Sequence, residues 1–315
     1  MVKKFFRDHS IHKKIAPFFD ELFFLNPMNY YFSWLMICTG IYLNLFLSDL
    51  SPQFLFSFNS GYLFLFVGLS FLLSSIYINK EITKSSSKNK TSNFIKEKYS
   101  TTKIIIFSRL LSITGVLILF FASWINALAG LLLGLLGIVI NKLFKNKIVY
   151  YFIESIILFF SGWYYTSFVN TSRSIIIYDL LFIFPYFILC YCIYMSKLKS
   201  DNFKNNGIDI SKYDFKFLLS LILILLCLFM GLSNNDPLLS IVSITSAGFY
   251  FYSFLRAQQK DIIRSFVYPL ALFNIFLMTI FPCLFIFHYI LFYISKYYYW
   301  HRFNIHYPTF LVDNG

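Results

Sequence analysis

Long uninterrupted runs of apolar residues divide this sequence, and they limit its possible folds more than any other feature. Runs such as 175–196 and 215–232 approach the roughly 20 apolar residues that a helix needs to cross a bilayer. The runs are continuous and do not alternate with polar residues, which favours helices over the strands of a barrel. Only 13% of the 315 residues are charged and 58% are hydrophobic, a composition atypical of soluble proteins. The sequence therefore predicts an all-α integral membrane protein.

Polar breaks between the apolar runs predict nine transmembrane helices. Their approximate ranges are 30–47, 55–78, 104–121, 123–141, 148–169, 175–196, 215–232, 237–256 and 266–295. The division between the third and fourth spans rests on a short break at Ser123. Three prolines, Pro185, Pro269 and Pro282, lie inside expected spans, where proline kinks a helix or begins one.

The distribution of basic residues predicts the orientation of these helices. With nine crossings and a cytoplasmic N-terminus, 24 of the 27 Lys and Arg residues fall inside, and Arg173, Lys296 and Arg302 fall outside. Because loops rich in Lys and Arg stay in the cytoplasm, we expect a multi-pass protein of the cell (inner) membrane with its C-terminus outside. The net charge of +13 then serves topology, and no nucleic-acid partner is expected.

The polar segments suggest three regions. Residues 1–29 carry lysines and aromatics spaced as in an amphipathic helix, so we expect a cytoplasmic interfacial arm. Residues 30–296 form the transmembrane domain, with two long cytoplasmic loops at 79–103 and 197–214 after the second and sixth spans. Residues 297–315 begin with three tyrosines and a tryptophan, which predicts an outer aromatic tail at the headgroups.

Two short motifs flank the first two expected spans. Leu25-Asn26-Pro27-Met28-Asn29-Tyr30 precedes the first span, and Tyr77-Ile78-Asn79 ends the second. The first is similar to the Arg-Pro-x-Asn-Trp motif, and the second to the Tyr-x-x-Asn-Asp motif, of the UbiA superfamily of intramembrane prenyltransferases. Together with the two long loops, they resemble that family over the whole chain. The resemblance implies a UbiA-like bundle of nine helices.

The resemblance also implies a magnesium site that this sequence lacks. In the family, aspartates in the two loops hold magnesium ions that bridge the diphosphate of an isoprenyl donor, because the leaving diphosphate needs hard cations. Alignment on Asn79 and on Gly207 places non-acidic residues at all the matching positions, which are Lys80, Thr83, Ser87, Ser196, Lys199 and Phe203. We therefore expect a degenerate member with no bound metal or other cofactor, magnesium being needed only if prenyl transfer persists.

Six polar residues remain as candidates for function. The resemblance places five of them, Asn79, Lys80, Lys84, Lys197 and Lys199, at a cavity mouth, where lysines can bind a diphosphate or a lipid headgroup as point charges. The alternative is that these are ordinary cytoplasmic lysines. The sixth, Glu154, lies about two turns inside the fifth span, and an ionisable group at that depth either has a functional role or is paired within the bundle.

Three functions follow from these features. The leading hypothesis is a UbiA-like membrane protein without ordinary magnesium-dependent prenyl transfer, a pseudoenzyme that binds an isoprenoid or other lipid or acts as a subunit of a membrane complex. The alternative is an active prenyltransferase that moves a prenyl group from a polyprenyl diphosphate to an aromatic or lipid acceptor. The third is a transporter, suggested by the predicted spans and Glu154. The expected partners are a membrane lipid or isoprenoid and other membrane subunits.

Overall fold

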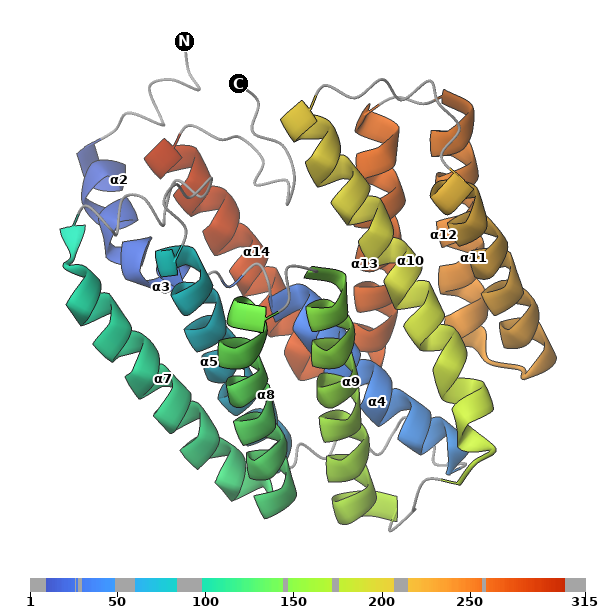
Figure 1. The fold of residues 1–315 in the computed structure, drawn as a ribbon, viewed down its shortest axis with the longest axis horizontal. Helices are drawn as coiled ribbons and strands as arrows, with labels where there is room; N and C mark the ends of the chain where they lie inside the picture. The colour runs from blue at the N-terminus through green and yellow to red at the C-terminus, as the bar shows by residue number, and fades with distance from the viewer. Residues whose placement is uncertain are drawn as a thin grey trace. The chain divides into compact units, whose positions relative to one another are not determined.

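A computed structural model describes residues 10–25, 27, 30–48, 60–83, 98–143, 147–171, 176–206, 215–256 and 259–303. Helices and their connecting turns account for these residues, and none of them forms a strand (Figure 1). Ten of the helices in the described part have at least 18 residues. The prediction of an all-α chain is therefore confirmed for the described residues.

The chain divides into two compact units. Unit 1 holds the described helices before Arg173 and, in addition, α14. Its elements are α2 (Ser10–Ile15), η1 (Ala16–Phe19), α3 (Asp20–Phe24), α4 (Tyr30–Leu47), α5 (Ser60–Thr83), α7 (Thr101–Ala122), α8 (Trp124–Leu143), α9 (Lys147–Thr166), the π-helical turn η4 (Ser167–Thr171) and α14 (Pro282–Phe303). We call the described residues 10–25 the arm.

Glycines allow two pairs of helices in unit 1 to pack closely. A Cβ atom added at Gly40 of α4 would lie 2.1 Å from the backbone oxygen of Phe159 in α9, and one added at Gly162 would lie 2.3 Å from that of Ile37. Gly68 of α5 and Gly115 of α7 face each other in the same way. A Cβ atom added at either one would lie 3.0 or 2.9 Å, respectively, from the backbone oxygen of the other. Close contact through small residues is the usual means by which helices associate in lipid.

The described part of unit 2 contains four helices, α10 (Asp179–Asn206), α11 (Phe215–Ser233), α12 (Pro237–Arg256) and α13 (Gln259–Ile280). The turn before α12 is held by Asp236, whose Oδ1 accepts hydrogen bonds from the backbone N–H groups of Leu238 and Leu239 at 3.1 and 3.2 Å. The Tyr186 hydroxyl of α10 donates to Asp236 Oδ2 at 2.6 Å. One buried carboxylate thus caps α12 and joins it to α10.

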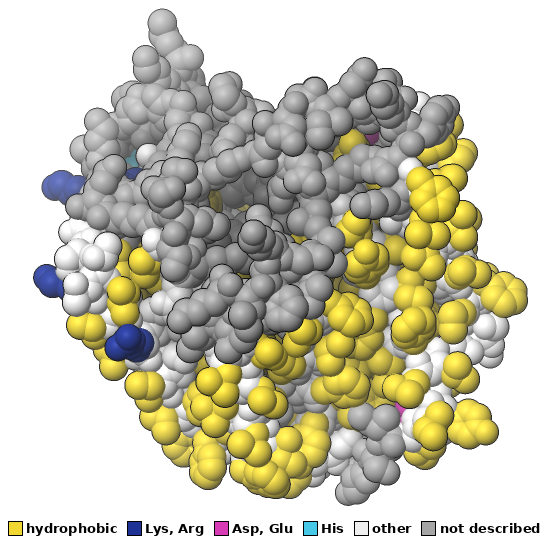
Figure 2. Space-filling view, viewed as in Figure 1, with side chains coloured by type: hydrophobic (Ala, Val, Ile, Leu, Met, Phe, Trp, Pro, Cys, Tyr) yellow, Lys and Arg dark blue, Asp and Glu magenta, His cyan; other side chains and the backbone are white. Residues whose placement is uncertain are grey.

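Six helices are long and apolar enough to cross a membrane, within the part of the chain that the structure describes. They are Tyr30–Leu47, Ser60–Asn79, Thr101–Ala122, Phe152–Val169, Asp179–Ser196 and Pro237–Arg256, and shorter apolar helices cover Trp124–Gly137 and Phe217–Ser233. Large apolar side chains are exposed on many of these helices, and Figure 2 shows hydrophobic side chains over much of the described surface in view. Such a surface suits lipid as the solvent.

The first eight expected spans each correspond to one helix, α4, α5 and α7 to α12. The break at Ser123 is confirmed, because Ser123 has an extended backbone between α7 and α8 and its Oγ accepts from the Asn126 N–H at 3.1 Å. The prediction of one helix over the last span, 266–295, is wrong. This range contains parts of two helices, since α13 ends at Ile280 and α14 begins at Pro282. Pro282 has no backbone N–H to continue α13, which accounts for the break.

The end of α14 lies against the arm, a contact that the sequence did not lead us to expect. Tyr298 and Arg302 of α14 bond to Asp20 of the arm, and the rings of His12 and His301 are stacked 4.1 Å apart. Residues in contact cannot lie on opposite faces of a bilayer with a hydrocarbon core of roughly 30 Å. An arm (1–29) inside and a tail (297–315) beginning outside are therefore incompatible in their described parts.

Candidate functional site

A row of polar side chains follows one face of α5 in unit 1. Ser70, Ser74 and Tyr77 are spaced four and three residues apart, and this spacing places them on the same side of a helix. We call these three residues the α5 polar face. Ser70 and Ser74 are buried and Tyr77 is half-buried, so the row lies inside the bundle and runs towards the end of α5 that precedes segment 84–97.

Each residue of the α5 polar face has a partner on a neighbouring helix. The indole N–H of Trp34 in α4 donates to Ser70 Oγ at 2.8 Å. The hydroxyl groups of Tyr30 and Ser74 are hydrogen-bonded to each other. The Tyr77 hydroxyl donates to Glu154 Oε1 in α9 at 3.4 Å, a long hydrogen bond. The polar face therefore links α5 to both α4 and α9.

Glu154 lies deep in unit 1, with only 3% of its surface exposed. It stands two turns inside α9, which begins at Lys147. A carboxyl group removed from water needs hydrogen-bond donors, and the Tyr77 hydroxyl supplies one. The structure thus brings together two features that the sequence marked separately, the Tyr77-Ile78-Asn79 motif and Glu154.

Aromatic side chains pack beside the polar face. The rings of Tyr30 and Trp34 are stacked with centroids 5.9 Å apart, and Trp34 meets Phe66 edge to face at 6.0 Å. His288 of α14 approaches Trp34 at 5.0 Å between centroids, and its backbone oxygen accepts from the Tyr31 hydroxyl at 3.0 Å. Apolar rings beside polar groups are the surroundings that suit an amphiphilic ligand.

The other predicted site residues that the structure describes lie near the ends of helices. Asn79 is half-buried in the last turns of α5, and Lys80 follows it in the same helix with a side chain outside the described residues. Lys84 lies beyond the described residues. Lys197 and Lys199 are in the last turns of α10 in unit 2, and their side chains are also outside the description. The structure thus brings together Tyr77 and Glu154 but does not test the lysines as a group.

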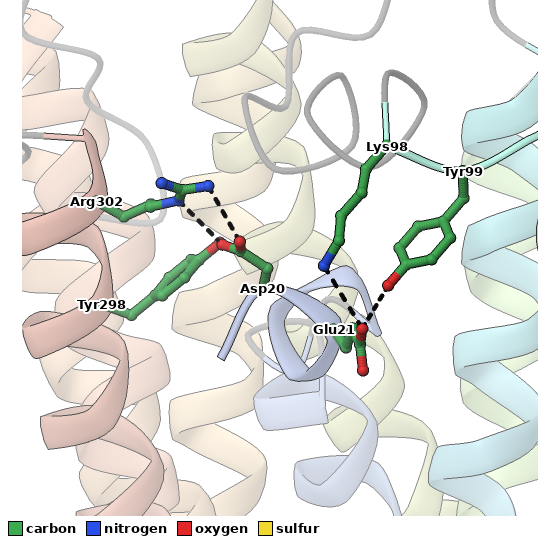
Figure 3. Close-up of polar contacts among 6 residues, drawn as sticks. All are labelled: Asp20, Glu21, Lys98, Tyr99, Tyr298 and Arg302. Carbon is green, nitrogen blue, oxygen red and sulfur yellow. Dashed lines mark hydrogen bonds and ion pairs between the residues drawn. The ribbon is translucent and has the colours of Figure 1, made fainter. Parts of the chain in front are cut away.

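A second polar cluster anchors the arm on two sides (Figure 3). The carboxylate of Asp20, only 1% exposed, accepts from the Tyr298 hydroxyl at 2.7 Å and from Nε and Nη2 of Arg302 at 3.1 Å each. We call Asp20, Tyr298 and Arg302 the Asp20 cluster. Two oxygens bound by one guanidinium form the strongest geometry of such an ion pair.

Glu21, the next residue, points to the chain just before α7. Its carboxylate accepts from the Tyr99 hydroxyl and lies 3.7 Å from Lys98 Nζ. A hydrogen bond between the side chains of Lys98 and Tyr99, together with the nearby charge of Glu21, raises the pKa of Lys98. Both acids of the described arm are therefore paired, one with α14 and one with the chain just before α7.

Sequence reasoning missed the Asp20 cluster. Asp20 and Arg302 are 282 residues apart, and neither belongs to a motif. Two signals were available: an acid inside an otherwise basic and apolar arm, and an arginine in a tail assigned to the opposite side. Among the described residues, no group of three or more His, Cys, Asp or Glu side chains is placed to hold a metal ion.

The geometry defines a class: an α-helical chain with six described helices long and apolar enough to cross a membrane, and with polar groups buried between them. No family model, no curated protein and no solved structure matches this chain. Its function is therefore argued from its own residues.

Proposed function

We propose that this chain is a multi-pass membrane protein that binds an amphiphilic lipid, of the isoprenoid phosphate class that the UbiA resemblance implies, without magnesium-dependent prenyl transfer. The observation that carries the proposal is the contact between Tyr77 and Glu154 towards the end of α5 that precedes segment 84–97. The buried Glu154 and the half-buried Tyr77 offer hydrogen bonds to a polar headgroup, and the rings of Trp34 and Phe66 along the same polar face offer apolar walls to its chain.

The lysines beyond the α5 polar face supply charge for the headgroup. Lys80 follows Tyr77 by about one turn of α5, and Lys84 comes four residues later in the sequence. Ammonium groups bind phosphate as point charges without a metal ion. The proposed ligand therefore has its phosphate towards the lysines and its chain beside Trp34 and Phe66.

Native mass spectrometry of the purified protein tests this proposal. We expect an anionic lipid to remain bound, and we expect Tyr77→Phe and Glu154→Gln each to lower its occupancy by up to about ten-fold, the effect of one lost hydrogen bond. Ser161→Ala is the matched control in α9, because Ser161 Oγ donates to Ile157 O in its own helix at 2.8 Å. Equal lipid occupancy in all three variants would contradict the proposal.

A prenyl-transfer assay separates lipid binding from the enzymatic alternative. The protein is incubated with magnesium, a polyprenyl diphosphate and an aromatic acceptor. We expect no prenylated product, because the positions aligned with the family's metal ligands carry no carboxylate. Product that disappears in Lys80→Ala and Lys199→Ala would instead establish an active transferase.

The burial of Glu154 also favours a second candidate, proton-coupled transport, since carboxyl groups inside membranes often carry protons. Proteoliposomes containing the protein would then acidify or take up a solute in a manner that Glu154→Gln abolishes. Identical fluxes in the original protein and in Glu154→Gln would exclude this role for Glu154.

A further inference from the structure

The arm exposes a row of large apolar side chains that its own fold does not cover. Ile11, Ile15, Phe18 and Leu22 are all exposed, and Phe18 is exposed to 82%. Their spacing of four, three and four residues places them on one side of the arm. We call these four residues the apolar ridge.

The opposite side of the arm is fixed to the rest of unit 1, so the direction of the ridge is defined. Ala16, Asp20 and Phe23 are buried. The ring of Phe23 is stacked on Tyr298 with centroids 4.2 Å apart, and the Asp20 cluster adds its ion pair on the same side. The ridge therefore faces away from α14.

The position of the arm along α14 matches the edge of a bilayer. Exposed side chains of α14 between Phe285 and Tyr293 are large and apolar, as on a helix surrounded by lipid. The residues that contact the arm follow directly, from Tyr297 to Arg302. Because α14 changes at this point to residues such as Lys296, His301 and Arg302, the arm lies where the headgroups begin.

The charges of this segment complement anionic headgroups. Its basic residues are Lys3, Lys4, Arg7, Lys13 and Lys14, and its acids are Asp8, Asp20 and Glu21. The last two acids bond to α14 and to the chain just before α7. Lys14 is exposed beside the ridge. A basic segment with an exposed apolar row is the pattern of helices that bind anionic membrane surfaces.

We propose that the apolar ridge of the arm inserts into the headgroup region of a bilayer rich in anionic lipids, holding the arm flat on the membrane while the Asp20 cluster ties it to α14. This binding surface is independent of the lipid site proposed at α5, since the two share no residue.

The test uses the full chain in lipid nanodiscs. An environment-sensitive fluorophore is attached at Phe18→Cys on the ridge or, as a control, at Glu21→Cys on the adjacent side, with the unsubstituted protein reporting any background labelling. In discs with anionic lipid, we expect emission from position 18 to shift to the blue and to be quenched by lipids brominated near the headgroup. Position 21 should show neither effect. In purely zwitterionic discs, the blue shift and the quenching at position 18 should both weaken. The affinity of the arm for the surface should fall by about five-fold for each lysine that loses its interaction with anionic lipid.

Charge is tested separately with Lys13→Gln and Lys14→Gln in the Phe18→Cys background. We expect these changes to reproduce the weakening in anionic discs, and expect high salt to do the same. Water-like emission from position 18 in every lipid would overturn the proposal. The apolar ridge would then be assigned as a binding surface for a partner protein. Quenching that depends on protein copies per disc and not on lipid would assign the ridge to a second copy. Equal insertion in both lipids would overturn the anionic preference.

Discussion

Gly40 and Gly162 lie where α4 and α9 are closest, and each faces backbone atoms of the other helix. A side chain at either position cannot be relieved by a rotamer change, because the atoms it meets belong to the backbone. The helices would have to separate, which would also strain the bonds from Asn44 Nδ2 to Ser167 Oγ and to Trp163 O, at 2.6 and 3.3 Å.

We therefore predict that Gly40→Ala and Gly162→Ala each destabilise the protein by about 1 to 3 kcal/mol, as overpacking usually does. Thermal unfolding in detergent measures the change. Gly248→Ala in α12 is the matched control, because an added Cβ there meets nothing within 4 Å. Equal melting temperatures for the three variants would show that α4 and α9 do not pack this closely.

Residues also show where sequence reasoning succeeds and where it stops. Glu154 was identified from its depth alone, because an ionisable group in an apolar run is conspicuous. Its contact with Tyr77 was not predicted, since that requires the rotation of α5 and α9 about their axes. The contact of Gly40 with α9 was likewise hidden, because an isolated glycine does not identify the helix that it faces.

Among the elements, α14 departs most from expectation. It begins at Pro282 instead of continuing α13, and it belongs to unit 1 while α13 belongs to unit 2. An apolar run longer than one crossing carries no mark of where it divides, apart from its prolines. Pro269 and Pro282 were equal candidates in the sequence, yet Pro269 lies inside α13 and only Pro282 begins a helix.

From the Asp20 cluster, we predict that the packing of α14 against the arm depends on the buried carboxylate of Asp20. Asp20→Asn keeps the shape but removes the charge that faces Arg302, and we expect a loss of about 2 kcal/mol, reduced from the value for a fully buried pair because Arg302 remains 25% exposed. Thermal unfolding in detergent measures it. Glu21→Gln, at an exposed ion pair, should have little effect. Equal losses in both variants would contradict a special role for Asp20.

At the scale of the whole molecule, the contact between the arm and α14 changes the expected topology. Moving Lys296 and Arg302 to the side of the arm raises the number of Lys and Arg residues on the expected cytoplasmic side from 24 to 26 of 27. The charge asymmetry is therefore stronger when the described arm and α14 from Lys296 onward lie on one side. We propose that these two described parts share a side of the membrane.

This topology predicts how cysteines react with a membrane-impermeant maleimide in intact cells. Lys14→Cys and Lys296→Cys should both be protected and should react only after permeabilisation. Arg173→Cys, expected on the other side, should react at once. Reaction at position 296 but not at position 14 in intact cells would restore the nine-crossing arrangement.

The fold class, eight of the helices and the Ser123 break could be predicted because each depends on local sequence. The division into two units could not, since it depends on which helices pack together. The candidate site was predicted in part: its motif and its acid were identified, but the serines of the α5 polar face were not, because small polar residues are common in transmembrane helices.

The separation of Asp20 and Arg302 has a consequence for biosynthesis. At translation rates of about 5 to 20 residues per second, their sequence separation of 282 residues delays Arg302 by about 15 to 60 s. During that interval the ribosome holds a nascent chain in which Asp20 lacks its guanidinium. The arm thus attains these contacts only after α14 has been made, so translation products that stop before Arg302 leave this carboxylate without its guanidinium and open to quality control.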